Sequence, residues 1–184
     1  MNATIIFIAV AALVAIAVAV LYNMLVGKRQ LARNGWSDID VQLKRRADLI
    51  PHLVSTVKGY AAHERALFEE IAERRGAAMA AGDDPKARGA AEGALARPLG
   101  RMIAVAEAYP DLKANQNFLD LQKQLAETED KLEMARRFYN GAVRELNTLV
   151  HTVPANFIAG AFGFKELPYF EADEGARATP KAGG

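Results

Sequence analysis

The chain has 184 residues, of which 51% are hydrophobic and 24% charged, a composition typical of an ordered protein with one modest domain. Its formal net charge is only +1, and acidic and basic residues are interleaved along the same segments, so we predict no nucleic-acid partner. It contains no cysteine, which excludes disulfides, thiolate metal sites and a cysteine nucleophile.

The N-terminal segment is strongly apolar. No charged side chain precedes Lys28, and the run from Ile5 to Val26 is nearly unbroken. This length suits a helix that crosses the hydrocarbon core of a membrane. A cleavable signal peptide is the alternative, because residues 17–19 resemble a cleavage site, but the usual positive N-terminal region is missing. We therefore predict a transmembrane anchor over residues 1–27.

The charges that follow the anchor predict its orientation. Lys28, Arg29 and Arg33 all lie on its C-terminal side. Basic residues favour the cytoplasmic side of a membrane. We therefore predict a single-pass protein of the cell (inner) membrane, with the lipid bilayer as a partner and the rest of the chain in the cytoplasm.

Three alanines within the anchor indicate a packing face. Ala11, Ala15 and Ala19 are four residues apart and share one side of a helix. Small residues at this spacing allow membrane helices to approach closely, so these alanines are candidates for membrane-helix packing in a homo-oligomer. The alternative is that alanine is simply a common apolar residue in such anchors.

The next segments predict amphipathic helices. Apolar residues recur at steps of three and four from Trp36 to Tyr60, with Pro51 as a bend. Lys58-Gly59 favours a helix end, although a helix unbroken to Met79 is the alternative. If the chain breaks there, a second helix runs from about residue 63 to Met79. The sequence AGDDPK then predicts a turn.

Two further helices are predicted before residue 150. The third spans about residues 86–108 and contains glycines and Pro98, so it depends on packing for its stability. The fourth has an apolar seam from Phe118 to Leu149 with the spacing of a coiled coil. With no alternating strand pattern, we predict an all-α fold, in which the N-terminal transmembrane helix precedes an antiparallel up-and-down bundle of long helices over residues 28–150.

The connection YPDLKANQNF, residues 109–118, is predicted to be a corner and not a catalytic loop. Pro110 disfavours helical geometry at Tyr109 and ends the third helix. Asn115 is placed to cap the fourth helix. Tyr109, Leu112 and Phe118 are expected to pack on both sides of the corner.

Three blocks of the sequence together resemble the LemA family. They are WSDIDVQLKRRADLIPHLVSTVKGYAAHE, EAYPDLKANQNFLDLQKQLAETEDKLEMARRFYNGAVRELNT and FIAGAFGFKELPYF, and they occur in the family's order. The resemblance covers about residues 21–170. It implies a membrane anchor followed by a helical bundle, an envelope location in bacteria and no established catalytic reaction. It also implies a link to the building of an internal membrane in a magnetosome-forming branch.

The residues do not predict an enzyme. His52, His63 and His151 are widely spaced and match no metal-ligand pattern, and no phosphate-binding loop or nucleophile elbow is present. We therefore expect no catalytic residue, metal or cofactor. Polar residues of the first and last bundle helices are instead expected to form ion pairs that fix the helix register. They are Asp38, Asp40, Arg45, Arg46, Glu129, Arg136, Arg137, Asn140 and Asn147.

The segment 151–170 is rich in aromatic residues. It is too interrupted to span a membrane, so we predict that it packs on the bundle, on a neighbouring subunit or at the membrane interface. Its candidate interface residues are Phe157, Phe162, Phe164, Tyr169 and Phe170. Residues 171–184 are predicted to be a disordered tail.

Two functions follow from this organisation. The first is a membrane-anchored, non-catalytic scaffold of the bacterial envelope that self-associates and organises the membrane or recruits envelope protein partners. The second is a monomeric accessory or binding module that presents a helical groove to an envelope enzyme or protease. The size of the protein in mild detergent distinguishes them.

Overall fold

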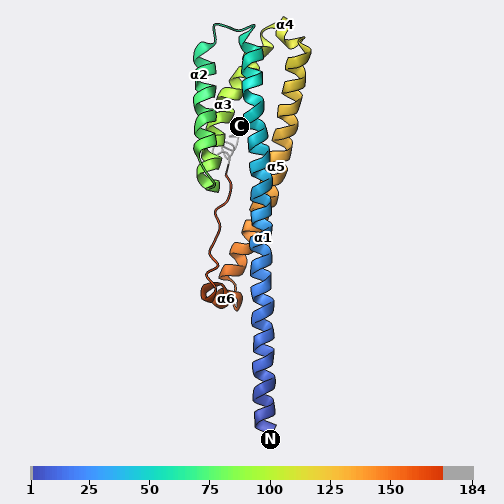
Figure 1. Ribbon diagram of the computed structural model, residues 1–184, viewed down its shortest axis with the longest axis vertical. Helices are drawn as coiled ribbons and strands as arrows, with labels where there is room; N and C mark the ends of the chain where they lie inside the picture. The colour runs from blue at the N-terminus through green and yellow to red at the C-terminus, as the bar shows by residue number, and fades with distance from the viewer. Residues whose placement is uncertain (1, 172–184) are drawn as a thin grey trace, which may run out of the picture. The chain divides into compact units, whose positions relative to one another are not determined.

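The computed structural model describes residues 2–171, and this part of the chain is helical without any strand, as predicted. The predicted disordered tail lies outside the described residues from residue 172 onward. The helices are α1 (Asn2–Lys58), α2 (Arg65–Ala80), α3 (Pro85–Glu107), α4 (Pro110–Lys113), α5 (Gln116–His151) and α6 (Ala155–Ala161) (Figure 1).

The chain divides into two compact units. Within the described residues, unit 1 comprises residues 2–37 and Arg137–Pro168, and unit 2 comprises Asp38–Arg136 and residues 169–171. Because α1 and α5 are long, each of them contributes to both units. The domain boundaries after residues 27, 150 and 170 stay a prediction.

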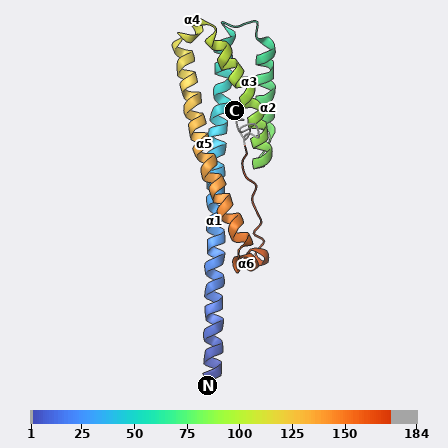
Figure 2. The same cartoon turned by 180° about the vertical axis from the view of Figure 1, so that it is seen from behind.

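Unit 2 is the up-and-down helical bundle that the apolar periodicity predicted. Its parts of α1 and α5 lie side by side with α2 and α3 (Figures 1 and 2). Their apolar stripes meet in one core, so packing compensates for the glycines and the proline of α3. The core includes Ile50, Leu53, Val57, Phe68, Ile71, Leu95, Leu99, Met102, Leu112, Phe118 and Leu121.

Helix α1 continues through Pro51, and a side chain from α2 compensates for the missing hydrogen bond. Proline has no backbone N–H, so the carbonyl of Ala47, four residues earlier, has no helical donor. Arg75 on α2 donates from Nε to this carbonyl oxygen at 2.6 Å. The proline thus creates an acceptor within α1 that a neighbouring helix uses.

The connections of unit 2 follow the local sequence signals. Helix α1 ends at Lys58 directly before Gly59, so the alternative of one helix to Met79 is wrong. Asp84 caps α3 by accepting from the Ala87 N–H at 2.9 Å. Asn115 caps α5 by accepting from the Phe118 N–H at 3.1 Å, as predicted.

The corner between α3 and α5 contains a helical turn that was not predicted. Tyr109 is extended, with φ −110° and ψ 100°, as expected for a residue before proline. Pro110 then begins the short helix α4, whose Leu112 is fully buried in the core. Phe118 is also buried and Tyr109 packs against the same core, so the predicted anchoring of this corner is confirmed.

Unit 1 combines the N-terminal part of α1 with the end of α5 and with α6. Its core contains Leu25, Leu146, Ala159 and Phe164. Where α1 approaches α5, Gly35 leaves room for a neighbour, since a Cβ there would lie 2.9 Å from Phe138 Cδ1 and 3.0 Å from Tyr139 Cα. The absence of a side chain at Gly35 therefore allows close packing of these helices.

Candidate functional site

The N-terminal part of α1 is an exposed apolar surface. In the part of the chain that the structure describes, α1 is the helix long and apolar enough to cross a membrane. The run from Ile5 to Val26 is about 33 Å long at ~1.5 Å per residue, which matches the ~30 Å hydrocarbon core. None of its most apolar window is buried within the protein. Ala11, Ala15 and Ala19 are all exposed there and lie on one side of the helix.

A glycine turn directs the aromatic segment back onto α1. Helix α6 ends at Ala161, and Gly163 has φ +70°, a conformation that glycine adopts without strain. The Phe164 N–H then donates to the Ala159 carbonyl at 2.9 Å, which closes the end of α6. This turn places the Phe164 ring in the core of unit 1.

Aromatic and cationic contacts hold this turn against α1 at the end of the apolar run. The Tyr22 ring centroid lies 4.9 Å from that of Phe162 and 5.8 Å from that of Phe164. The Arg29 guanidinium lies 4.5 Å from the Phe164 ring centroid, within the range of a cation–π interaction. The turn is therefore fixed along the stretch of α1 between Tyr22 and Arg29.

The extended chain after this turn is attached to α5. Asn147 donates from its amide to the Leu167 carbonyl at 3.0 Å and accepts from the Leu167 N–H at 2.9 Å. The Tyr139 hydroxyl donates to the Pro168 carbonyl at 2.8 Å. One amide thus satisfies both backbone groups of a residue that has no helical partners.

The five predicted interface residues differ in exposure. Phe157, Phe162 and Tyr169 have 68%, 55% and 40% of their surface exposed. Phe164 and Phe170 are buried within the protein. The exposed members are available to an external surface, whereas the buried members belong to the packing of the chain itself.

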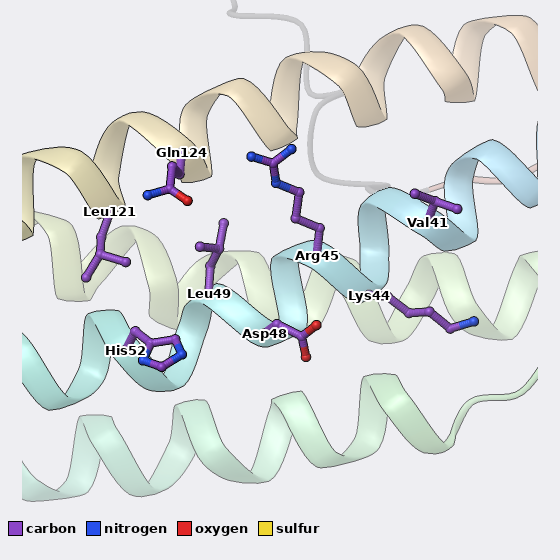
Figure 3. A pocket seen from close by; sticks show the side chains of 8 residues that line it. All are labelled: Val41, Lys44, Arg45, Asp48, Leu49, His52, Leu121 and Gln124. Carbon is purple, nitrogen blue, oxygen red and sulfur yellow. The ribbon is translucent and has the colours of Figure 1, made fainter.

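A groove runs between α1 and α5 in unit 2, with a volume of about 600 Å³. Six of its residues come from α1 and two from α5, and Arg45 extends toward α5 (Figure 3). Its lining mixes apolar, basic and acidic side chains. The lining residues are Val41, Lys44, Arg45, Asp48, Leu49, His52, Leu121 and Gln124.

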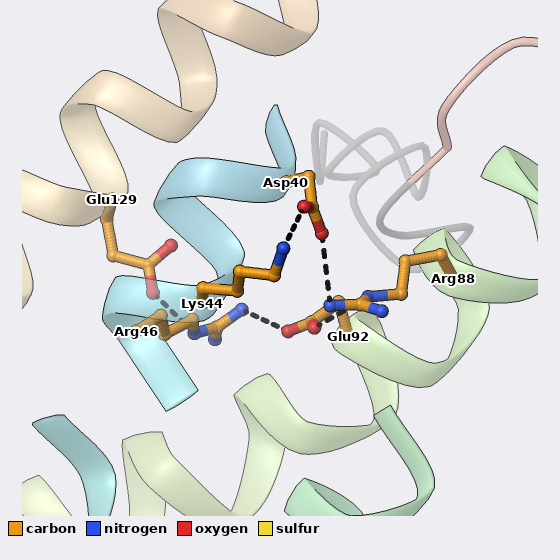
Figure 4. A network of polar contacts seen from close by, with 6 residues as sticks. All are labelled: Asp40, Lys44, Arg46, Arg88, Glu92 and Glu129. Carbon is orange, nitrogen blue, oxygen red and sulfur yellow. Dashed lines mark hydrogen bonds and ion pairs between the residues drawn. The ribbon is translucent and has the colours of Figure 1, made fainter. Parts of the chain in front are cut away.

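A buried ion-pair network connects three helices of unit 2. Arg46 on α1 places Nη1 3.2 Å from Oε2 of Glu92 on α3 and Nε 2.9 Å from Oε1 of Glu129 on α5 (Figure 4). Arg88 lies 3.5 Å from Glu92 and 3.9 Å from Asp40. The Nε atoms of both arginines make ion pairs without hydrogen-bond geometry.

The environment of Glu92 opposes its ionisation. Burial raises the pKa of this carboxyl above its ordinary value of 4.5, while the charges of Arg46 and Arg88 act in the opposite direction. Arg46, Arg88 and Glu92 are buried, so the network offers no open substrate position. Its arrangement favours a structural role, since the charged groups of α1 and α3 must align before they are buried, and the partly exposed Glu129 of α5 completes the pairing of Arg46.

The network includes residues that the sequence analysis did not predict. Arg46, Glu129 and Asp40 were expected to pair across the bundle, but Arg88 and Glu92 of α3 were not. Their spacing of four residues on one helix was the available signal. Because α3 is rich in glycine and contains Pro98, its faces were not evident from periodicity.

The histidines have separate surroundings. His52 lines the groove of unit 2, and His151 contacts Glu166 in unit 1. Within residues 2–171, no group of three or more His, Cys, Asp or Glu side chains is arranged to hold a metal ion. The expectations of no catalytic residue, metal or cofactor stay predictions.

The exposed apolar helix and the solvated bundle define the class of this molecule, a membrane-associated, all-helical protein. The family model described as the LemA family matches residues 35–182. The chain belongs to the LemA family.

Curated relatives agree with this assignment. Magnetosome protein MamQ 2 of Paramagnetospirillum magneticum is 27% identical over 175 residues, which cover 82% of this chain and 64% of the relative. MamQ of Magnetospirillum gryphiswaldense is 25% identical over 174 residues, covering 81% and 64%. Protein LemA of Metamycoplasma hominis is 24% identical over 152 residues, covering 83% and 69%.

These similarities indicate a membrane-associated, non-catalytic protein at the level of the family. The chain spans 64% of the length of the magnetosome relatives that it matches. None of the family and protein names refers to a reaction or a substrate.

Proposed function

We propose that this protein is a membrane-anchored, non-catalytic scaffold of the bacterial envelope that self-associates through its anchor. The observation that carries the proposal is the apolar run of α1, whose most apolar window has no residue buried within the protein. Exposing an apolar surface of this size to water is unfavourable in free energy. The polar, charged surface of the bundle then provides the area that organises the membrane or recruits envelope partners.

The alanine side of α1 supports self-association. Ala11, Ala15 and Ala19 are exposed and lie on one side of the helix, so a second copy of α1 can approach closely there. The names of two relatives, both called magnetosome proteins, support a role in organising a cellular structure. The basic residues Lys28, Arg29 and Arg33 support a cytoplasmic bundle.

A second candidate function rests on the groove between α1 and α5. Its volume of about 600 Å³ and its mixed lining favour a monomeric accessory module that presents this groove to an envelope enzyme or protease. In that case, the anchor only holds the module at the membrane.

The mass of the intact protein in mild detergent tests these functions. A discrete oligomer supports the scaffold, and a monomer at all concentrations contradicts it and favours the accessory module. Ala15→Ile should convert the oligomer to smaller species because the larger side chain blocks close approach. Ala17→Ile is the matched control, since residue 17 lies about 200° away around the helix at ~100° per residue. Equal effects of both substitutions would contradict packing through the alanine face.

A further inference from the structure

Helix α6 fully buries only small side chains and exposes Phe157, its largest apolar side chain, while Ile158 packs partly against the core of unit 1. Its buried residues are the small Ala155 and Ala159, at 3% and 1% exposure. Large apolar residues point outward, with Phe157 and the preceding Val153 each 68% exposed. A helix in water normally buries its largest apolar side chains, so this arrangement favours an apolar environment outside the protein.

The level of this surface relative to the bilayer follows from contacts within unit 1. The ring of Phe162, 55% exposed, packs on Tyr22 at a centroid distance of 4.9 Å. Tyr22 lies in the last turns of the apolar run, where tyrosine is favoured at the membrane–water boundary. Phe164 contacts both Tyr22 and Arg29, which are about 10 Å apart along α1 at ~1.5 Å per residue.

The bilayer is the occupant that these observations favour. The exposed apolar surface of α1 and that of α6 meet where Tyr22 contacts Phe162. A lipid surface that receives the apolar run of α1 also reaches the surface beside it, because the two are adjacent at this contact. Arg29 lies on the charged side of this boundary, where a guanidinium reaches the headgroups.

We propose that α6 and the residues that flank it form an interfacial membrane element, in which Val153, Phe157 and Phe162 insert into the boundary between headgroups and acyl chains. This inference rests on the proposed membrane anchor and adds a second contact with the bilayer. Two contacts restrict the rotation and tilt of α1 more than a spanning helix alone. Phe164 has a different role, because its buried ring joins α6 to α1.

The experiment uses the full chain in phosphatidylcholine–phosphatidylglycerol nanodiscs, with one introduced cysteine per variant, because the chain contains none of its own. A nitroxide at Phe157→Cys should be more accessible to oxygen than to a water-soluble nickel chelate. Val153→Cys is a second variant, for use if Phe157→Cys does not fold, and its nitroxide should show the same preference for oxygen. Ala11→Cys is the control for the span, and Met79→Cys, at a residue 53% exposed on α2, is the control for water.

Each pattern of accessibility has a distinct meaning. The proposal is supported if the ratio of oxygen accessibility to nickel accessibility is higher at residue 157 than at residue 79. Preference for the nickel chelate at residue 157, with oxygen preferred at residue 11, overturns the interfacial element and leaves the anchor standing. Protection from both reagents at residue 157 overturns it in favour of a protein contact. Access of nickel to residue 11 overturns the membrane anchor itself.

Discussion

Gly89 on α3 is a residue where one methyl group is expected to change the packing of a distant segment. A Cβ at this position would lie 2.4 Å from the Glu171 carbonyl oxygen, which belongs to the backbone and has little freedom to move. Gly89→Ala should therefore displace residues 169–171, including the buried Phe170, and lower the free energy of unfolding by about 1–3 kcal/mol. Chemical denaturation measures this loss.

Gly100 provides the matched control on the same helix. A Cβ there meets nothing within 4 Å, so Gly100→Ala should stabilise the protein by about 0.5–1 kcal/mol through helix propensity alone. If both variants gain stability equally, the close approach at Gly89 is not a constraint on the fold.

Glu92 predicts a pH dependence with a defined sign. Burial raises the pKa of its carboxyl in the folded state, so the folded protein binds this proton more tightly than the unfolded chain. The contribution of Glu92 is therefore most favourable below pH 4.5 and declines as the pH rises through the raised pKa. As the pH rises from acidic to neutral, the stability of the Glu92→Gln variant should therefore increase relative to that of the unsubstituted protein.

Thermal unfolding at several pH values measures this difference. Glu92→Gln also alters the hydrogen bond with Arg46 and the ion pair with Arg88, so the informative quantity is how the stability difference between the two proteins changes with pH. Glu145→Gln is a control whose relative stability should change with pH in the opposite direction, because the hydrogen bond and charge of Lys28 lower the pKa of that exposed carboxyl. If Glu92→Gln instead lost stability relative to the unsubstituted protein as the pH rises, the raised pKa of Glu92 would be contradicted.

At the scale of the elements, the hydrogen bond between α1 and α2 depends on a proline. Arg75→Ala should cost about 1.5–3 kcal/mol, because the Ala47 carbonyl then loses its donor. In a Pro51→Ala background the cost should be smaller, since residue 51 regains an N–H for that carbonyl. A double-mutant cycle by denaturant unfolding measures the coupling.

Arg74→Ala is the control for this cycle, because it removes the same charge from an exposed position of α2. Its effect should be the same with Pro51 and with alanine at that position. An equal cost of Arg75→Ala in the two backgrounds would show that Arg75 does not compensate for the proline.

The elements themselves were predictable from local chemistry. Lys58-Gly59, Asp84 before Pro85 and Asn115 are signals for helix ends that act within a few residues of the chain. Helix α4 was missed because a single turn lacks periodicity, and its stability comes from the burial of Leu112. Local signals therefore determined the boundaries, but not the short element that depends on packing.

The candidate sites were only partly predictable for a related reason. Polar residues on α1 and α5 indicated ion pairs, yet the participation of Arg88 and Glu92 depends on how α3 is rotated within the bundle. The aromatic residues were recognised as one segment, but the turn at Gly163 decides that Phe164 is buried while Phe162 is exposed. Such choices depend on contacts distant in sequence.

At the scale of the whole molecule, membrane orientation is the property that one labelling experiment decides. The basic residues after the span place the bundle in the cytoplasm under our proposal. A cysteine at the exposed position of Met79→Cys should then react with a membrane-impermeant maleimide only after the cells are lysed. Reaction in intact cells would reverse the orientation, and the cysteine-free parent chain provides the blank.

The chain contains a single tryptophan, and its position gives the protein an optical reporter. The Trp36 ring centroid lies 5.7 Å from that of Tyr139, so its emission depends on the packing of α1 against α5 in unit 1. Circular dichroism, in contrast, reports the helices of both units together. If the unfolding midpoints measured by fluorescence and by circular dichroism differ, the two units unfold in separate steps. The midpoint of the tryptophan signal then belongs to unit 1.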